Sequence, residues 1–182
     1  MRRSSLLFAA VLAIFTASLL TAQGANATGL SGRRAPSFSL PDSAFLQHDV
    51  LDYRGKWLLL DFMRTDCPHC KALSQLLEKK RASWGTRVAV LSVVISPPDN
   101  QATVAKYIAE TKITNPMVFD SGQVALSYFK ATPARPAFDT PHLFAINPQG
   151  MIVRDWAQLQ AEDPGFSAEL DAVISGASKK KK

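Results

Sequence analysis

The two cysteines of this chain, Cys67 and Cys70, are separated by only two residues. They follow an apolar run at 57–63 and precede leucines at helical spacing, so we expect them where a buried strand leads into a helix. Two thiols this close can alternate between a dithiol and a disulfide. In this strand–helix context the sequence therefore predicts a redox site.

A helix start gives the two sulfurs different properties. Cys67 is expected at the N-cap, with Pro68 at the first helical position, where the missing N–H costs nothing. Free N–H groups and the positive end of the helix dipole favour a thiolate at Cys67. Cys70 falls one turn further in, so we expect Cys67 to attack and Cys70 to resolve. A protonated His69 would add a cation beside the thiolate and make the disulfide a stronger oxidant.

Residues 1–27 have the features of a secretory signal peptide. A pair of arginines precedes an uncharged run at 6–20, and small residues occupy the expected cleavage site at 25–27. The run is about 15 residues long, shorter than the roughly 20 that a bilayer span needs. We therefore expect export to the periplasm or an equivalent compartment, with an uncleaved membrane anchor as the alternative.

The remainder is long enough for one domain, which we place at 35–176. The Gly/Ser/Arg-rich segment 28–34 is predicted to be a flexible lead-in, and 177–182 a basic disordered tail. The chain has a formal net charge of +6, and the terminal run of lysines has no aromatic residues nearby. We therefore expect no nucleic-acid partner, no stable membrane insertion beyond a weak attraction of the tail to anionic surfaces, and a monomer.

Apolar periodicity and turn residues predict alternating strands and helices. In chain order these are strands at 36–41, 47–51 and 57–63, a helix to about 83, a strand at 88–95, a helix capped by Asp99 or Asn100, a strand at 117–119, a helix at 124–129, strands at 141–146 and 151–156, and a helix from 164 to 174. The pattern indicates an α/β protein with a mixed central sheet and helices on both faces.

This arrangement resembles the thioredoxin fold over nearly all of the predicted domain. It is most similar to the exported TlpA/ResA-like branch, related to the AhpC/TSA group, because of its extra N-terminal strands and an inserted strand–helix unit. Three motifs carry the resemblance: the cysteine pair after the strand, the dipeptide Thr140-Pro141, and the turn at 147–150.

The resemblance implies a protein thiol–disulfide oxidoreductase without a cofactor, acting on protein thiols or disulfides and serviced by a separate redox partner. Asp61 matches the buried carboxylate that accepts or relays the Cys70 proton, and burial should raise its pKa. Pro141 matches a cis-proline facing the cysteines. Thr140 backbone groups, together with Pro68, are the implied substrate-binding elements, since an extended peptide can pair there by strand addition.

Two departures from the family pattern leave the direction of electron flow open. Asp66 stands where the family usually has Trp before the first cysteine, and its charge opposes thiolate formation. The branch often has a buried Glu at the end of the strand that follows the cysteine motif, whereas this chain has Ser96-Pro97-Pro98 in that region. The Pro-His pair between the cysteines is that of strongly oxidising DsbA proteins, whereas the fold branch indicates a reductant.

Other functions remain as alternatives. The cysteines could be half of a metal site, as in a zinc protein or a copper chaperone, although a closed zinc site needs four ligands and His48 and His142 are isolated in sequence. A thiol peroxidase would place Thr or Ser three residues before its reactive Cys, whereas Thr65 lies two before it. Asp61 could instead lie on a surface strand, and we expect His142 to be structural.

Overall fold

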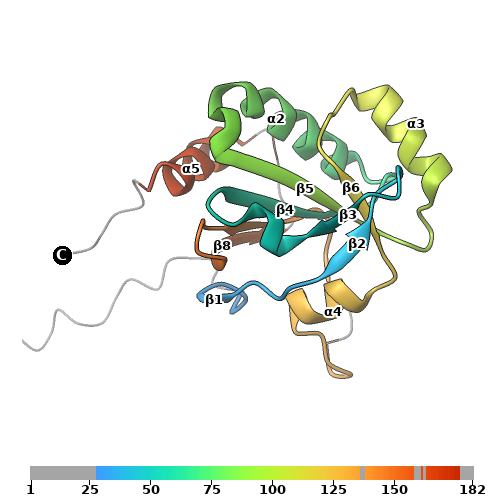
Figure 1. Cartoon of the computed structure of the whole chain (residues 1–182), viewed down its shortest axis with the longest axis horizontal. Helices are drawn as coiled ribbons and strands as arrows, with labels where there is room; N and C mark the ends of the chain where they lie inside the picture. The colour runs from blue at the N-terminus through green and yellow to red at the C-terminus, as the bar shows by residue number, and fades with distance from the viewer. Residues whose placement is uncertain (1–27, 136–137, 158–160, 162, 177–182) are drawn as a thin grey trace, which may run out of the picture.

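A six-stranded mixed sheet forms the centre of the fold (Figure 1). The computed structural model describes residues 28–135, 138–157, 161 and 163–176, and within them the strand order is β1-β8-β7-β4-β5-β6. The strands are β1 (Arg33–Arg34), β4 (Trp57–Met63), β5 (Val88–Ile95), β6 (Met117–Asp120), β7 (His142–Ile146) and β8 (Met151–Ala157). The central strand β4 pairs in parallel with β5 and antiparallel with β7, which confirms the predicted mixed sheet.

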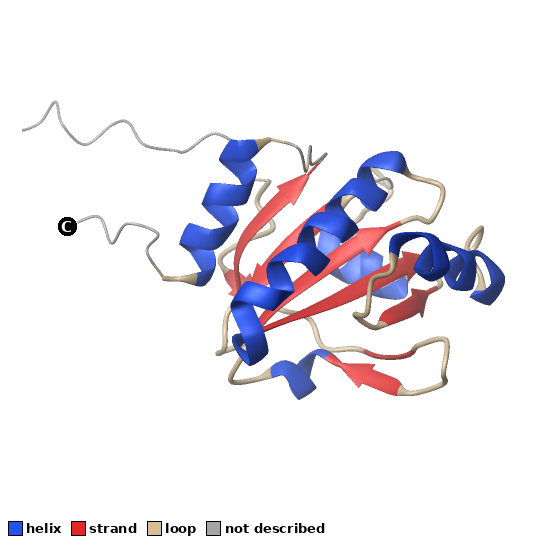
Figure 2. Cartoon of the chain, turned by 90° about the horizontal axis from the view of Figure 1, so that it is seen from above, coloured by secondary structure: helices blue, strands red, loops and turns tan. Residues whose placement is uncertain are grey.

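Helices cover both faces of this sheet (Figures 1 and 2). One face carries α2 (Pro68–Trp84), α3 (Gln101–Thr111) and α5 (Pro164–Ile174). The other face carries α4 (Gln123–Phe129). Short 3₁₀ helices, η1 (Val50–Tyr53) and η2 (Gly85–Arg87), precede β4 and β5.

The side chains of β4 alternate between the two layers, as the pleat of a strand requires. Leu58, Leu60 and Phe62 are fully buried among residues of the α4 face. Leu59 is buried against α2 and α5, and Met63 against α2 and α3. Each such burial contributes about 1.5–3 kcal/mol. The same alternation directs Asp61 toward the α2 and α3 layer, where the cysteine-bearing turn lies.

The N-terminal part of the domain differs from expectation. Residues 28–34 are predicted to be a flexible lead-in, but β1 pairs with β8 through Arg33 and Arg34, and the Thr28 hydroxyl donates to Asp155 at 2.6 Å. Leu30 is buried in the core. Composition alone does not indicate these contacts, which arise because the open edge of β8 offers backbone groups that this segment satisfies.

The predicted extra N-terminal strands are present and are shorter than expected. β2 (Ser39–Pro41) and β3 (Gln47–Asp49) form their own antiparallel pair. A single bridge between Asp42 and Val118 joins this pair to the edge of the central sheet. The main helices and strands otherwise match their predicted positions to within a few residues, since long apolar runs and clear caps define them.

The predicted signal peptide at 1–27 and the predicted tail at 177–182 lie outside the described residues. Within the described part of the chain, none of the helices has the length and apolar character needed to cross a bilayer.

Candidate functional site

The first turn of α2 holds the cysteine pair as the sequence predicts. Cys67 is the N-cap, in extended backbone geometry, and Pro68 occupies the first helical position. The Cys70 backbone N–H donates to the Cys67 Sγ at 3.2 Å. The sulfur of Cys67 therefore takes the place that a Ser or Asp oxygen usually has at a helix start. A negative charge on it would be stabilised by this amide and by the helix dipole.

The loop before β7 faces the same sulfur. The Thr140–Pro141 peptide bond is cis, as the resemblance implies, and the Thr140 carbonyl oxygen lies 3.9 Å from the Cys67 Sγ, which can donate to it as a thiol. Pro141 is buried and Thr140 is partly exposed. The structure thus brings together Cys67 and Thr140, which are far apart in the sequence, and leaves Cys67 half-buried at the surface.

Cys70 lies behind Cys67 and is completely buried. Both cysteines are free thiols in this structure. Burial raises the pKa of the Cys70 thiol strongly, and the hydrogen bond with Cys67 and the charge of Asp61 raise it further. The two sulfurs therefore differ as predicted, with Cys67 accessible and Cys70 held as a protonated thiol.

Asp61 is the buried carboxyl group of the site. Its side chain has no exposed surface, and neither carboxyl oxygen has a hydrogen-bond partner within the described residues. Burial raises its pKa to about 8. The charge of Asp61 raises the pKa values of both Cys70 and Tyr107, so the carboxyl group lies beneath the turn that carries the cysteines. A group that titrates near neutral pH next to a buried thiol is suited to proton transfer. The alternative of a surface Asp61 is excluded.

His69 and Pro68 lie on the exposed side of the same turn. The structure gives the His69 ring no ion pair with the carboxylates of the described residues. Both side chains are therefore available to an incoming protein, rather than being part of the buried relay.

Asp66, the unusual residue before Cys67, does not stand alone. Arg64 donates to both of its carboxyl oxygens, from Nε at 3.0 Å and from Nη2 at 2.7 Å. A bidentate pair of this kind holds the two side chains in one geometry. The negative charge of Asp66 is consequently offset by the guanidinium of Arg64, a pairing that the sequence pattern did not indicate.

Asp99 is a further residue of the site. The sequence predicted only that it could cap a helix. Asn100 caps α3 instead, and Asp99 is buried. The carboxylate of Asp99 accepts from the Thr65 backbone N–H at 2.9 Å, from the Thr65 hydroxyl, and from the Thr103 hydroxyl at 2.7 Å. It thereby ties the loop that carries Cys67 to the start of α3. The sequence signal was an acidic residue after the two prolines that follow a strand.

The two remaining histidines each contact a carboxylate. His142 Nε2 lies 2.9 Å from Asp155, and both residues are buried, which fits the structural role expected for His142. His48 lies between Asp42 and the Tyr53 hydroxyl, at 2.9 and 3.1 Å. In the described part of the chain, no three His, Cys, Asp or Glu side chains gather as a metal site would require.

The fold and the site together define the class of protein. A mixed sheet, a dithiol at the start of the following helix and a cis-proline loop opposite it are the features of a thioredoxin-fold protein. Solved structures agree at low sequence identity. A thiol:disulfide interchange protein from Chlorobium tepidum is 16% identical with a TM-score of 0.66, over 80% of this chain and 95% of its own. A secreted disulfide oxidoreductase of Mycobacterium tuberculosis is 15% identical with a TM-score of 0.61, over 76% and 95%.

The chain belongs to the AhpC/TSA family, whose sequence model matches residues 31–155. The match begins within the segment predicted to be a lead-in, in agreement with the contacts of β1. Among curated relatives, the thiol-disulfide oxidoreductase ResA of Bacillus subtilis is 24% identical over 123 residues, which cover 68% of this chain and 65% of ResA. The chain therefore spans slightly less than two thirds of that relative.

Proposed function

We propose that this protein is an exported thiol–disulfide oxidoreductase that exchanges a dithiol for a disulfide with protein substrates. One observation carries the proposal: the half-buried Cys67 Sγ accepts the Cys70 amide at the start of α2, with the Cys70 thiol buried behind it. The names of the ResA relative and of the two structural neighbours support the same chemistry.

The reaction needs only the two cysteines and the substrate. The Cys67 thiolate attacks one sulfur of a substrate disulfide and forms a mixed disulfide, and the displaced sulfur leaves as a thiolate that takes up a proton. Cys70 then attacks Cys67 Sγ, releases the second substrate thiolate and closes the Cys67–Cys70 disulfide. The substrate gains two electrons and the protein loses two. The reverse sequence oxidises a substrate dithiol.

Asp61 supplies the proton acceptor for the second step. Cys70 cannot attack as a thiol, and burial disfavours its ionisation. An ionised Asp61 accepts the Cys70 proton as the sulfur attacks, and its pKa of about 8 lets it do so near neutral pH. In the reverse direction the protonated carboxyl returns the proton to the departing Cys70 thiolate.

Substrate contacts centre on the cis-proline loop and the exposed turn of α2. An extended substrate segment pairs with the Thr140 backbone, while Pro68 and His69 line the approach to Cys67. A segment that binds by its backbone accepts many sequences, as a general exchange protein requires. The signal-like sequence of residues 1–27 supports an exported location for this activity.

The direction of electron flow is decided by one measurement, the reduction potential at equilibrium with glutathione. On the established scale, a value near about −120 mV identifies an oxidant and one near about −270 mV a reductant. A protein whose thiols exchange no disulfide with glutathione or with a model protein substrate would contradict the proposal. Fractionation of cells producing the full chain tests export separately, through the location and mass of the product.

The thiol peroxidase alternative gains no support from the geometry. The Thr65 hydroxyl donates to Asp99 and Arg64 pairs with Asp66, so these polar groups are committed to holding the loop. The metal-site alternative lacks further ligands near the sulfurs among the described residues.

A further inference from the structure

A pocket lies at the end of the sheet opposite the cysteines. Its volume is about 390 Å³. It is bounded by the segment after β1, by η1 and by the turn between β7 and β8, and its wall includes Arg34, Ala35, Pro36, Val50, Leu51 and Arg54. Arg54 precedes β4 whereas Cys67 follows it, and a strand of seven residues spans about 20 Å. The pocket is therefore separate from the redox site.

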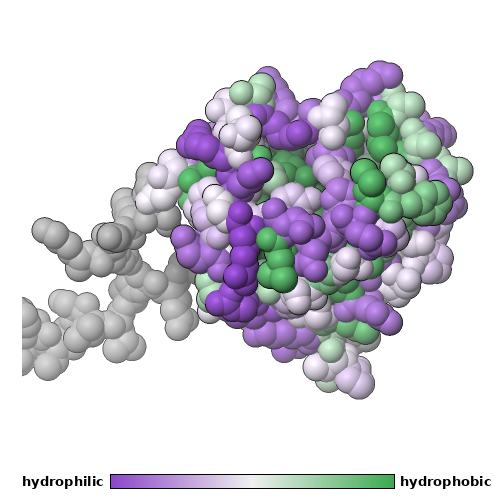
Figure 3. Space-filling model, in the orientation of Figure 1, coloured by the Kyte–Doolittle hydropathy of each residue, from purple (hydrophilic) through white to green (hydrophobic). Residues whose placement is uncertain are grey.

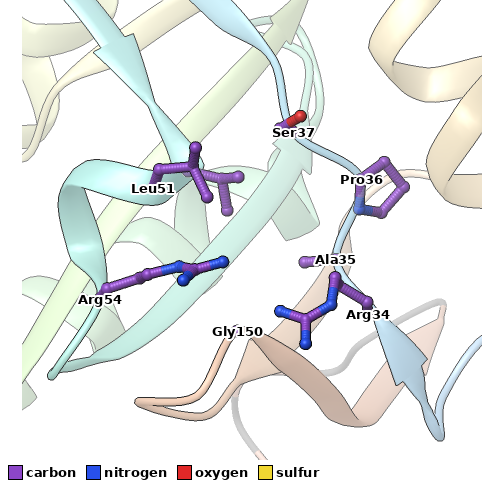
Figure 4. A pocket seen from close by; sticks show the side chains of 8 residues that line it. Arg34, Ala35, Pro36, Ser37, Leu51, Arg54 and Gly150 are labelled. Atoms are coloured by element: carbon purple, nitrogen blue, oxygen red, sulfur yellow. The ribbon is translucent and has the colours of Figure 1, made fainter.

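Two guanidinium groups enter this pocket from opposite walls. Figure 4 shows Arg34 and Arg54 reaching toward each other across the opening. Within the described residues neither forms an ion pair with a carboxylate, and the one polar contact of either guanidinium is from Arg34 Nη1 to the Gln149 carbonyl oxygen at 3.5 Å. Like charges that converge without a counter-charge repel each other, so a bound anion would relieve this repulsion.

The walls that carry the arginines are fixed to the same turn. The Ala35 N–H donates to the Gly150 carbonyl and the Gly55 N–H donates to the Pro148 carbonyl, both at 3.0 Å. Gly150 has a φ of +79°, and a Cβ at this position would lie 3.7 Å from the Arg34 Nη1. The two arginine-bearing segments are thus held in place before any ligand arrives, which lowers the entropic cost of binding.

The pocket also has an apolar side. Ala35 and Val50 are buried, while Leu51 is 49% exposed beside the opening. On the face seen in Figure 3, a strongly hydrophilic strip runs directly beside a hydrophobic group. A ligand that fits both features carries a compact charge and an apolar body.

We propose that this pocket binds a phosphate monoester with a small apolar substituent. The dianionic phosphate is held between the Arg34 and Arg54 guanidinium groups, since planar forks of this type match phosphate oxygens in pairs. The substituent rests on Pro36 and Leu51. Soluble organic phosphates and the headgroup of a phosphatidic acid share this chemistry.

The test is a titration of the full chain with phenyl phosphate, followed by the amide NMR signals of Ala35 and Gly55. We expect saturable shifts at these amides and a weaker response to inorganic phosphate, which lacks the apolar body. The double variant R34Q/R54Q should bind phenyl phosphate at least about tenfold more weakly, because it loses charge-assisted hydrogen bonds from both sides. The double variant R87Q/R135Q, which loses the same charge from exposed positions elsewhere, should bind as the parent does.

A second arm uses phosphatidylcholine vesicles with and without phosphatidic acid. Binding to phosphatidic acid vesicles that R34Q/R54Q abolishes identifies a lipid headgroup as the ligand source, and binding of phenyl phosphate alone identifies a soluble one. The proposal is overturned if neither phenyl phosphate nor the acidic vesicles shift the Ala35 and Gly55 signals saturably. It is also overturned if R34Q/R54Q and R87Q/R135Q weaken binding equally. Neither result would bear on the thiol chemistry of Cys67.

Discussion

The backbone N–H of Cys70 donates to the Sγ of Cys67 at 3.2 Å, so the side chain of the attacking cysteine caps the backbone of the resolving one. This contact has two consequences. It directs a donor and the positive end of α2 at the accessible sulfur, which favours its thiolate. It also holds the backbone of Cys70 close to the Cys67 sulfur, with the Cys70 side chain buried one turn into the helix.

Substitution of the two cysteines should separate the two steps of the exchange. Cys67→Ser should abolish disulfide exchange with a protein substrate, since the remaining thiol is buried and protonated. Cys70→Ser should leave the first step intact and accumulate a mixed disulfide through Cys67. Mass spectrometry after non-reducing quench measures both outcomes. A Cys67→Ser protein that still forms mixed disulfides through Cys70 would contradict the assignment.

Replacement of Asp61 should change how stability depends on pH. The unfolded carboxyl titrates near about pH 4, and burial raises the pKa in the folded protein to about 8. Between these values the folded state keeps a proton that the unfolded state has lost, so stability falls as pH rises through this window. Asp61→Asn should remove this loss. Relative to the parent, its free energy of unfolding should therefore rise by about 3 to 5 kcal/mol between pH 4 and pH 8, measured by urea unfolding of the reduced protein.

A second buried aspartate provides the control for this experiment. Asp120 accepts from the backbone N–H groups of Val124 and Ala125 at 3.1 and 2.8 Å, so Asp120→Asn weakens two satisfied hydrogen bonds and should destabilise the protein. Asp61→Asn should in addition slow the closing of the Cys67–Cys70 disulfide by at least about tenfold, the lower range expected for loss of a general base. Parallel stability profiles for the parent and Asp61→Asn across pH 4–8 would disprove the raised pKa of Asp61.

Features of this protein that depend on neighbouring residues are predictable from its sequence, whereas features that depend on distant contacts are not. The N-cap role of Cys67, the burial of Asp61 and the strands around them follow from neighbouring residue types, so periodicity and capping rules predict them. The cis bond at Pro141 was implied only by the resemblance. Composition suggested a flexible segment at 28–34, because the partner that orders it, β8, comes more than a hundred residues later.

The role of Asp99 shows the same limit within the site. Its contact with Thr65 spans 34 residues and depends on how two loops meet at the end of the sheet. No local pattern distinguishes it from the helix cap next to it. The pairing of Arg64 with Asp66, in contrast, spans two residues, but its geometry depends on the backbone of the loop.

Breaking the pair of Arg64 and Asp66 should tune the reactivity of Cys67. Arg64→Gln leaves the Asp66 charge beside the sulfur without its partner, which opposes thiolate formation, whereas Asp66→Asn removes that charge. Both side chains are well exposed, so the effect is screened and small. At pH 6 we expect alkylation of Cys67 to slow about twofold to fivefold in Arg64→Gln and to quicken by a similar factor in Asp66→Asn. Changes of the same sign in both variants would show that charge is not the cause.

Loss of the Asp99 carboxylate should loosen the loop before Cys67. Asp99→Ala leaves the Thr65 N–H without its acceptor and should cost about 1–3 kcal/mol of stability. Asn100→Ala, the matched control, removes only the cap of α3 and costs a similar amount, about 0.5–2 kcal/mol. Of these two residues, only Asp99 also holds the loop. Asp99→Ala should therefore slow the alkylation of Cys67 and raise the rate of hydrogen exchange at the Thr65 amide, whereas Asn100→Ala should do neither. Both variants are measured at a temperature where each is folded. Equal exchange at Thr65 in the two variants would mean that the loop is held by other contacts, and that Asp99 acts on the stability of α3 alone.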